Sequence, residues 1–546
     1  MNIGIFLAYM PGVKLGSEGL GRYIGNLIKG FTEDRNKVGI ACPQWLVESL
    51  FDLFEDFHIA KDQVEIITTQ DTPIVWKIYT RIFGTTTEKK TNKKVYIFRS
   101  IFDFVDLIIG KILGITSMFV FLLLCLLGIA IGVLLLPLVL VVGILGSLAY
   151  LLLKLLKKNK RISKKIFQKT EIVHQTYSKS KESIQEYVYN ELNRKTVRKL
   201  VQKANREEQD VWFVPTLFWP DAVDINATTV FVAPDLVTTE FPFPFAEVPG
   251  SVTATDICVR TVERADYFIT YGDFIKREVL LKRYGKDDSH VISIAHINNT
   301  SLPYLQILDN GGFSGTSKEE VQNAFCRDLL TRLPAYSTEK AFLEDMNFGQ
   351  VKYIFYASQQ RPHKNILNLL RAYEYLLREK EIDFKLFLTC DLEFDTGLAD
   401  FIQEHRLEHY VISFQRVPVQ LLSALYACAE LVVTPTLYEG AFLTFTIGEG
   451  MSVGTPCIMG RIPQVTDMIP EVYPLDHILF DPLDYLDMAD RILYGVENRQ
   501  QLYQDELPMY KDIEARTGEI VARDYVNAFR KFILLDQKEV AIRGNH

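Results

Sequence analysis

The chain has 546 residues, enough for two or three domains of ordinary size, and 48% of its residues are hydrophobic while 23% are charged. This composition is typical of a folded protein and excludes global disorder or a fibrous repeat. The formal net charge of −8 argues against nucleic acid as the main partner, because binding to phosphate backbones favours an overall basic surface.

The first half alternates short apolar segments with amphipathic ones, which predicts an α/β domain with a parallel sheet. Glycines at positions 12, 16, 19 and 21 separate the first predicted strand from a helix and would allow close backbone approach to a ligand. The N-terminus lacks the basic region of a signal peptide. Predicted strands in this half are NIGIFLAY, KVGIACP, VWFVPT, TVFVAPD, YFITYG and HVISIAH.

An apolar segment interrupts this domain, with 42 consecutive uncharged residues between Lys111 and Lys154. One bilayer crossing takes about 20 apolar residues, so the segment is long enough for two crossings and too long for a buried core helix. Gly128, Gly132 and Pro137 lie near its middle, where the chain would have to reverse. No polar loop separates the halves, so the sequence fits a re-entrant hairpin as well as two full spans.

A basic block follows, since residues 154–206 hold sixteen Lys or Arg and only four Asp or Glu. Such a block next to a membrane favours cytoplasmic placement and attraction to anionic head groups. It could equally be a solvated basic helix that only sets the topology. The seven cysteines show no C-x-x-C pair and no zinc-site spacing, and most lie in apolar surroundings. We therefore expect buried free thiols in a reducing compartment.

The second half begins afresh at VKYIFYAS and repeats the alternation of strands and helices through FKLFLTC, VISFQRV, LVVTPT and TPCIMG. Two doubly wound domains that face each other across a cleft are the simplest architecture, with ligands beyond the carboxyl ends of the strands. The predicted N-terminal domain comprises residues 1–100 and 207–297, and the predicted membrane insertion between them is 101–206. The interdomain connection is 298–349, and the C-terminal domain is 350–510. A final helix at 511–546 is expected to pack across both domains.

The strongest chemical signal is the segment PTLYEGAFLTFTIGEGMSVGTPCIMG at 435–460. A predicted strand ends in a turn with Glu439 and Gly440, and a helix carrying Glu449 follows. Backbone amides at the start of that helix can bind a phosphate, helped by the helix dipole. A carboxylate on the same helix can accept two hydroxyl groups of a ribose.

A second segment, ASQQRPHKNILNLLRAYEYL at 357–376, runs from a predicted strand through a basic turn into an amphipathic helix. Lys364 lies next to the helix start, where it would meet a diphosphate leaving group. Arg361 and His363 belong to the same turn, and both could equally be solvated basic residues.

These segments resemble glycosyltransferase family 4, whose members are retaining enzymes of the GT-B fold with the signature E-G-F-G-L-P-x-x-E-A-M-A-x-G-T-P. The two glutamates are ten positions apart here and eight in the family, so two residues are inserted between them. The resemblance implies that Glu439 lies beside the sugar ring of the donor and that Glu449 holds the nucleotide ribose. By the same alignment, further donor-binding residues are Gly440, Ala441, Phe442 and Leu443.

The basic turn resembles the family loop that brings an arginine and a lysine to the donor phosphates. Lys364 matches the lysine, whereas Gln359 occupies the arginine position and Arg361, two residues on, is a candidate substitute. The first loop resembles the family's G-G-x-x-R-Y, and this likeness implies a place for Gly19 near the donor diphosphate. Arg22, in the same loop, is expected to be structural.

The segment TVFVAPDLVTTEFPFPF at 229–245 resembles the family strand that ends in H-D-L. Asp235 matches the aspartate, but Pro234 takes the place of the histidine that commonly approaches the transferred sugar. We expect Asp235 either to replace part of that hydrogen bonding, as a catalytic residue, or to cap a turn.

The resemblance implies a GT-B α/β protein that moves a hexose, with retention, from a nucleotide-diphosphate sugar. No D-x-D motif is suitably placed, so no metal or other cofactor is expected. The membrane insertion belongs to the acceptor half, which points to a lipid-linked saccharide or glycolipid acceptor in cell-surface polysaccharide or glycolipid synthesis. The protein is then membrane-associated, with cytoplasmic catalytic domains.

Two other readings compete with this one. Pro234 and Gln359 suit a non-catalytic membrane-bound protein that binds a nucleotide sugar or a partner enzyme. A phospho-sugar transferase acting on a lipid carrier is disfavoured, because the region of Glu439 and Glu449 would have no role in it.

Overall fold

The computed structural model describes most of the chain outside the predicted membrane insertion, and no helix among the described residues is long and apolar enough to cross a membrane. The predicted hairpin, like most of the basic block, lies almost entirely outside the described residues. Those residues are 1–10, 13–17, 19–69, 118–120, 122–124, 126–127, 194–246, 251–296, 318–337, 340–392, 396–440, 445–466, 473 and 476–543.

A seven-stranded sheet is formed by strands from both sides of the predicted insertion, in the order β3-β2-β1-β4-β5-β6-β7. The registered strand pairs are parallel, and most strand residues are buried, as expected for a parallel sheet that is covered on both faces. Its strands are β1 (Asn2–Phe6), β2 (Lys37–Pro43), β3 (Val64–Thr69), β4 (Val211–Val214), β5 (Thr229–Ala233), β6 (Tyr267–Thr270) and β7 (Val291–Ser293).

Helices alternate with these strands, as the doubly wound pattern requires. They are α1 (Gly19–Glu33), α2 (Val47–Asp56), α7 (Val237–Glu240), α8 (Pro242–Ala246), α9 (Ser251–Arg264) and a π-helix at Ile275–Leu281. Gly4 in β1 shows how tightly the sheet is packed, because a Cβ there would lie 2.6 Å from the indole ring of Trp212.

A second sheet has six parallel strands in the order β10-β9-β8-β11-β12-β13. They are β8 (Tyr353–Tyr356), β9 (Lys385–Leu388), β10 (Val411–Ser413), β11 (Leu431–Thr434), β12 (Cys457–Gly460) and β13 (Leu479–Phe480). The accompanying helices are α10 (Lys318–Leu330), α11 (Lys340–Glu344), α12 (Ile366–Glu379), α13 (Thr396–Glu404), α14 (Val419–Ala427), α15 (Phe445–Ser452), α16 (Pro463–Thr466), α17 (Tyr485–Glu497) and α18 (Arg499–Glu514).

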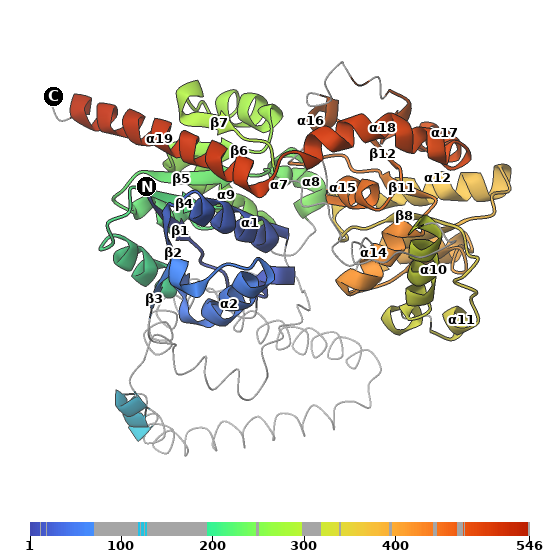
Figure 1. Cartoon of the computed structure of the whole chain (residues 1–546), viewed down its shortest axis with the longest axis horizontal. Helices are drawn as coiled ribbons and strands as arrows, with labels where there is room; N and C mark the ends of the chain where they lie inside the picture. Colours follow the sequence, from blue (N-terminus) through green and yellow to red (C-terminus); the bar gives the residue numbers. More distant parts are fainter. Residues whose placement is uncertain are drawn as a thin grey trace, which may run out of the picture. The chain divides into compact units, whose positions relative to one another are not determined.

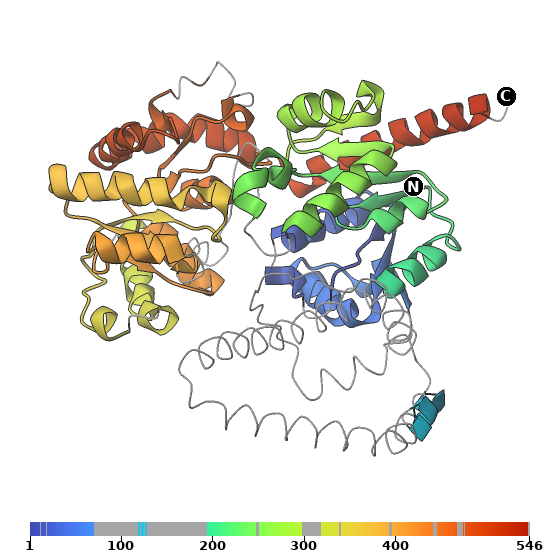
Figure 2. The ribbon, with the colours of Figure 1, turned by 180° about the vertical axis from the view of Figure 1, so that it is seen from behind.

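The long helix α12 shows why these segments fold as they do. Its apolar residues recur every three or four positions, so they form one stripe that is buried against the sheet while the charged residues face outward. Figure 2 shows this helix in yellow, running along its sheet.

The final helix, α19 (Gly518–Arg543), packs beside α1, as Figure 1 shows in red and blue. The Tyr23 hydroxyl donates a hydrogen bond of 2.6 Å to the Tyr525 hydroxyl. Further along the two helices, the rings of Phe31 and Phe529 are 6.1 Å apart. Gly30 permits this approach, since a Cβ there would lie 2.5 Å from the Cβ of Ala522.

Contacts divide the chain into two compact units. The first comprises Met1–Arg22, Lys37–Val214 and Asp221–Ala227, and the second comprises Tyr23–Asn36, Pro215–Pro220 and Thr228–His546. The second unit contains the whole six-stranded sheet together with β5, β6, β7 and α19. All six cysteines in the described residues are buried and free, as predicted.

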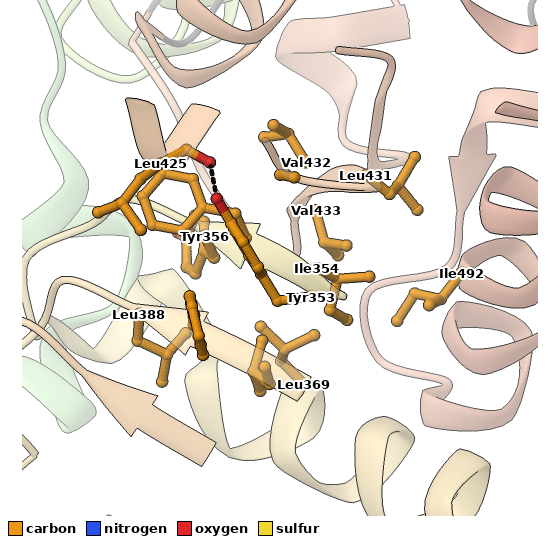
Figure 3. Packing of buried hydrophobic residues seen from close by; sticks show 14 of the residues in the cluster. Tyr353, Ile354, Tyr356, Leu369, Leu388, Leu425, Leu431, Val432, Val433 and Ile492 are labelled. Atoms are coloured by element: carbon orange, nitrogen blue, oxygen red, sulfur yellow. Dashed lines mark hydrogen bonds between the residues drawn. The ribbon is translucent and has the colours of Figure 1, made fainter. Parts of the chain in front are cut away.

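The core of the six-stranded sheet is drawn in Figure 3, where Ile354 on β8 packs among residues of β11, α12 and α17. Tyr353 is fully buried in this core, and its hydroxyl donates a hydrogen bond of 2.8 Å to the carbonyl oxygen of Leu425.

Replacing Tyr353 with phenylalanine is expected to lower the free energy of unfolding by about 1–2 kcal/mol, because the buried Leu425 carbonyl would lose its partner. Urea unfolding measures this loss. The matched control is Tyr485→Phe, at a ring that is 38% exposed, for which a change within about 0.5 kcal/mol is expected. An equal loss in both variants would contradict the prediction.

Candidate functional site

Three of the predicted site residues meet just beyond the carboxyl ends of strands. Asp235 follows β5, Lys364 follows β8 and Glu439 follows β11, and all three belong to the second compact unit. Lys364 Nζ lies 2.5 Å from Glu439 Oε1, and both side chains are mostly buried, with exposed fractions of 18% and 16%. Asp235 interacts electrostatically with both of them. The site therefore holds one lysine among two carboxyl groups.

Backbone and side-chain hydrogen bonds hold the two turns of this site together. Asn365 has a left-handed backbone, with φ of 56°, a conformation that asparagine adopts more readily than most residues. Its amide group donates to the carbonyl oxygens of Pro435 at 2.9 Å and Pro482 at 2.6 Å. The start of α12 is thereby tied to the turn that carries Glu439. The sequence analysis missed Asn365, although an asparagine directly before a predicted helix was a usable signal.

His363 strengthens the same connection. Its carbonyl oxygen accepts hydrogen bonds from the Leu437 amide at 2.8 Å and the Thr436 hydroxyl at 3.2 Å. Its ring is only 6% exposed and stacks on Phe245 of α8, with ring centroids 5.6 Å apart. Hence His363 is not part of a solvated basic turn, which was one of the two readings of the sequence.

The Asp235 side chain is exposed to solvent, but the protein atoms that crowd around its carboxyl group raise its pKa above the ordinary value. The backbone amide of Val237 donates to Asp235 Oδ1 at 3.5 Å and partly lowers that pKa, whereas the nearby Glu439 raises it. An exposed carboxyl group at this place can hydrogen-bond a hydroxyl group of a bound ligand.

Arg361 is exposed, and its guanidinium donates two hydrogen bonds, of 3.2 and 3.0 Å, to the side-chain oxygen of Gln359. Gln359, which stands at the position of the family's arginine, thus holds Arg361, the candidate substitute, in place. Arg361 also acts electrostatically on Asp235, so it contributes positive charge to the site.

Glu449 lies on α15 and is only 4% exposed. Its carboxylate is close to the hydroxyl of Tyr426 on α14. Burial, first of all, raises the pKa of that hydroxyl, and Glu449 raises it further.

Some of the other predicted donor-binding residues lie outside the part of the chain that the structure describes. Ala441, Phe442 and Leu443 lie outside the described residues. A Cβ on Gly440 would lie 2.0 Å from the carbonyl oxygen of Pro234, so only glycine fits at this turn. Gly19 begins α1 within the other compact unit, and its place near the donor stays a prediction. Within the described ranges, no group of three His, Cys, Asp or Glu residues could hold a metal ion.

The burial of His363 predicts a specific pH dependence of stability. Burial lowers the pKa of its imidazole from 6.5 to about 3, so the folded protein keeps the ring neutral. Between about pH 3 and 6.5 the unfolded chain binds a proton that the folded chain does not, and folding is weakened as pH falls through this window.

We therefore expect the free energy of unfolding of wild type to fall, relative to that of His363→Phe, by up to about 1.4 kcal/mol per pH unit below pH 6.5. Urea unfolding at pH 4, 5, 6 and 7 measures the difference. His409→Phe is the control, at an exposed histidine that also packs on an aromatic ring, Phe342 at 4.5 Å. Parallel pH curves for wild type and His363→Phe would show that the imidazole is not held neutral.

Comparison with known proteins bears on this site. Residues 340–509 match the family model described as "Glycosyl transferases group 1", and this range contains Lys364, Glu439 and Glu449. O-antigen chain mannosyltransferase B of Escherichia coli is 30% identical over 172 residues. That match covers 31% of this chain and 43% of the relative, so the chain spans less than half of the curated relative that it matches.

Solved structures resemble the whole chain at low sequence identity. Sucrose-phosphate synthase from Thermosynechococcus elongatus matches with a TM-score of 0.52 and 12% identity, covering 98% of this chain and 100% of that one. HepE of Anabaena in complex with UDP-glucose matches with a TM-score of 0.49, also at 12% identity, over 98% of this chain and 100% of its own. The predicted α/β class with two parallel sheets is confirmed, and the match to sucrose-phosphate synthase supports the predicted fold. The match to the family model supports the glycosyltransferase that the sequence predicted.

Proposed function

We propose that this protein is a retaining glycosyltransferase that moves a hexose from a nucleotide-diphosphate sugar to a membrane-associated acceptor, a lipid-linked saccharide or a glycolipid. The observation that carries the proposal is the pair of Lys364 and Glu439, which lies beyond the strand ends of a domain that matches a glycosyltransferase family. A mostly buried ion pair costs desolvation, so its position at a ligand-binding edge favours a chemical role over a purely stabilising one.

The proposed role of each side chain depends on where negative charge develops during sugar transfer. As the sugar leaves, the diphosphate gains negative charge, and an ammonium group already held in place stabilises that charge without reorganisation of water. Lys364 is the group in position for this, and Arg361 adds positive charge nearby. When Lys364 turns to the diphosphate, Glu439 becomes free to accept hydrogen bonds from sugar hydroxyls.

Asp235 would assist the transfer as a hydrogen-bonding group. Its exposed carboxyl has a raised pKa, to which the nearby Glu439 contributes. We propose that it hydrogen-bonds the transferred sugar, in the place where Pro234 replaces the histidine of the resembling family.

The acceptor is inferred from the insertion. The uncharged segment between Lys111 and Lys154 is long enough to enter a bilayer, and the basic block after it would favour anionic head groups. The curated relative is named for an O-antigen chain, which supports a saccharide acceptor. Equal activity on a soluble saccharide and on a lipid-linked one would contradict this part of the proposal.

The decisive experiment screens nucleotide sugars for thermal stabilisation of the full-length chain. A ligand at 100 times its Kd adds roughly 2.7 kcal/mol to the free energy of unfolding, which is easily measured as a shift in Tm. We expect one or a few nucleotide sugars to stabilise the protein. If none shifts the Tm, the donor site is wrong.

A non-catalytic protein that binds a nucleotide sugar is the second candidate. It is favoured by the carbonyl oxygen of Pro234, which occupies the space beside Gly440, and by Gln359, which binds Arg361. Transfer or donor hydrolysis by wild type, but not by Glu439→Gln, would exclude it. Binding without turnover in both proteins would support it.

A further inference from the structure

The outer face of the last helix, α19, combines lysines with exposed apolar side chains. Lys531, Leu534, Leu535, Lys538 and Ile542 occupy positions i, i+3, i+4, i+7 and i+11, so they share one face of the helix. Leu534 and Ile542 are 58% and 61% exposed, and both lysines are exposed as well. Neither lysine has a hydrogen bond or an ion pair with any residue that the structure describes.

The acidic residues of the same turns point toward the sheet instead. Asp536 accepts a hydrogen bond of 2.7 Å from the hydroxyl of Thr228, just before β5. Glu539 Oε1 lies 2.9 Å from Nε2 of His290, just before β7. The acids of these turns are therefore used against the first sheet, and the five residues of the outer face include two lysines and no acid.

A cavity of about 670 Å³ lies beside this face, between α19 and the edge strand β7. All three residues of β7 contribute to its lining, and α19 contributes its two lysines and two leucines. The lining holds three lysines and two aspartates in all, and one of each, Lys276 and Asp288, form an ion pair of 2.8 Å. The charge around the cavity is therefore positive on balance.

Lysines that flank exposed apolar side chains are typical of a helix that lies on a membrane surface. The aliphatic stem of a lysine covers apolar surface while its ammonium group reaches an anionic head group. Figures 1 and 2 show in red that the last turns of α19 extend beyond β5, β6 and β7, so these strands do not cover them. A second copy of this chain fits this face less well, because two-fold pairing would bring lysines against lysines.

We propose that the outer face of α19 docks on a bilayer that contains anionic lipids. Lys531 and Lys538 bind head-group phosphates, while the apolar side chains between and after them enter the head-group region. This inference deepens the proposed function and rests on its membrane-associated acceptor. It adds a membrane contact near the end of the chain, far in sequence from the predicted insertion at 101–206.

The test examines two sides of α19 separately in the full-length chain. Leu534→Cys and Val540→Cys are each labelled with a fluorophore whose emission moves to the blue in apolar surroundings, and wild type labelled in parallel gives the background. Val540 is the matched control, because it is 60% exposed on the same helix but lies half a turn away from Lys531. With vesicles of phosphatidylglycerol and phosphatidylcholine, the emission of Leu534→Cys should shift to the blue and that of Val540→Cys should hardly change.

Further measurements isolate the role of charge. Each lysine near an anionic surface raises the affinity about fivefold, so adding Lys531→Ser and Lys538→Ser to Leu534→Cys should abolish most of the shift. Vesicles of pure phosphatidylcholine should produce no shift. Salt at about 1 M, where the Debye length is about 3 Å, should weaken the shift with anionic vesicles. Stabilisation by a nucleotide sugar should be the same with and without the two lysines, because they lie outside the donor site.

The outcomes distinguish this inference from the proposed function. If the chain binds the vesicles but the label at position 534 does not respond, the docking face is wrong while the membrane-associated acceptor stands. Equal shifts at positions 534 and 540, or equal shifts with both kinds of vesicle, would also overturn the inference. A shift at position 534 that depends on protein concentration without vesicles would show that a second copy of the chain covers the face. If the chain binds no vesicles, the membrane part of the proposed function fails first.

Discussion

Replacing Lys364 with methionine is expected to lower kcat/KM for sugar transfer by about 10²- to 10³-fold, the usual effect of removing one group that stabilises developing charge. Methionine keeps an unbranched side chain of similar length but carries no charge. The loss should appear mainly in kcat, because the diphosphate gains its charge in the transition state. A transfer assay with the nucleotide sugar that stabilises wild type measures it.

Lys352→Met is the matched control for this variant. Lys352 lies in the same domain and is also paired with a carboxylate, Asp383 at 2.6 Å, but the lysine is half exposed on the surface. Its replacement should leave transfer unchanged, because exposed ion pairs contribute little. If kcat/KM of Lys364→Met falls by less than about threefold, the lysine does no more than neutralise the charge of Glu439. The glutamate then also loses its expected role, and Glu439→Gln should be as active as wild type.

Replacing Gly450 with leucine is expected to lower the free energy of unfolding by about 1–3 kcal/mol and to weaken donor binding. Gly450 follows Glu449 on α15, and its lack of a side chain lets the helix lie close to the sheet. A Cβ there would lie 2.8 Å from Cys457 Sγ and 3.0 Å from Val432 Cγ2, so a larger side chain must push the helix away. Urea unfolding and nucleotide titration measure the two effects.

The control is Gly349→Leu, in an exposed turn where a Cβ would meet only the side-chain oxygen of Asn347, at 3.2 Å. It should change neither stability nor binding by much, since that contact is with a movable side chain. A Gly450→Leu variant that unfolds and binds like wild type would show that α15 tolerates displacement. In that case donor binding by the Glu449 carboxylate would not depend on close packing of α15 against the sheet.

The strands of the second half illustrate how much of the fold could be predicted from the sequence. Each predicted apolar segment contains a strand, because the strands of a parallel sheet are buried on both faces and must be almost wholly apolar. The helix after Lys364 was readable for a related reason, since its buried residues recur with the period of a helix. Two strands escaped prediction: β3 is interrupted by the exposed Glu65, and β13 has only two residues.

The chemical roles of the site residues could be predicted from the sequence, but the contacts between them could not. Lys364 and Glu439 were expected in one donor pocket, and the structure pairs them. No pattern in the sequence showed that His363 would be buried. His363 accepts a hydrogen bond from Thr436, which lies 73 positions further along the chain, and periodicity within one segment carries no information about such a contact.

The sequence by itself determined the strand and helix pattern, the charges of the basic turn and the two glutamates, because these depend on residue type and local spacing. The tertiary structure alone decided which side chains meet. It paired Lys364 with Glu439, placed Asp235 near them with a raised pKa and buried the imidazole of His363. The physical reason is that contacts and burial depend on how loops from separate strands come together, and burial is what changes the charge state of an ordinary carboxyl or imidazole group.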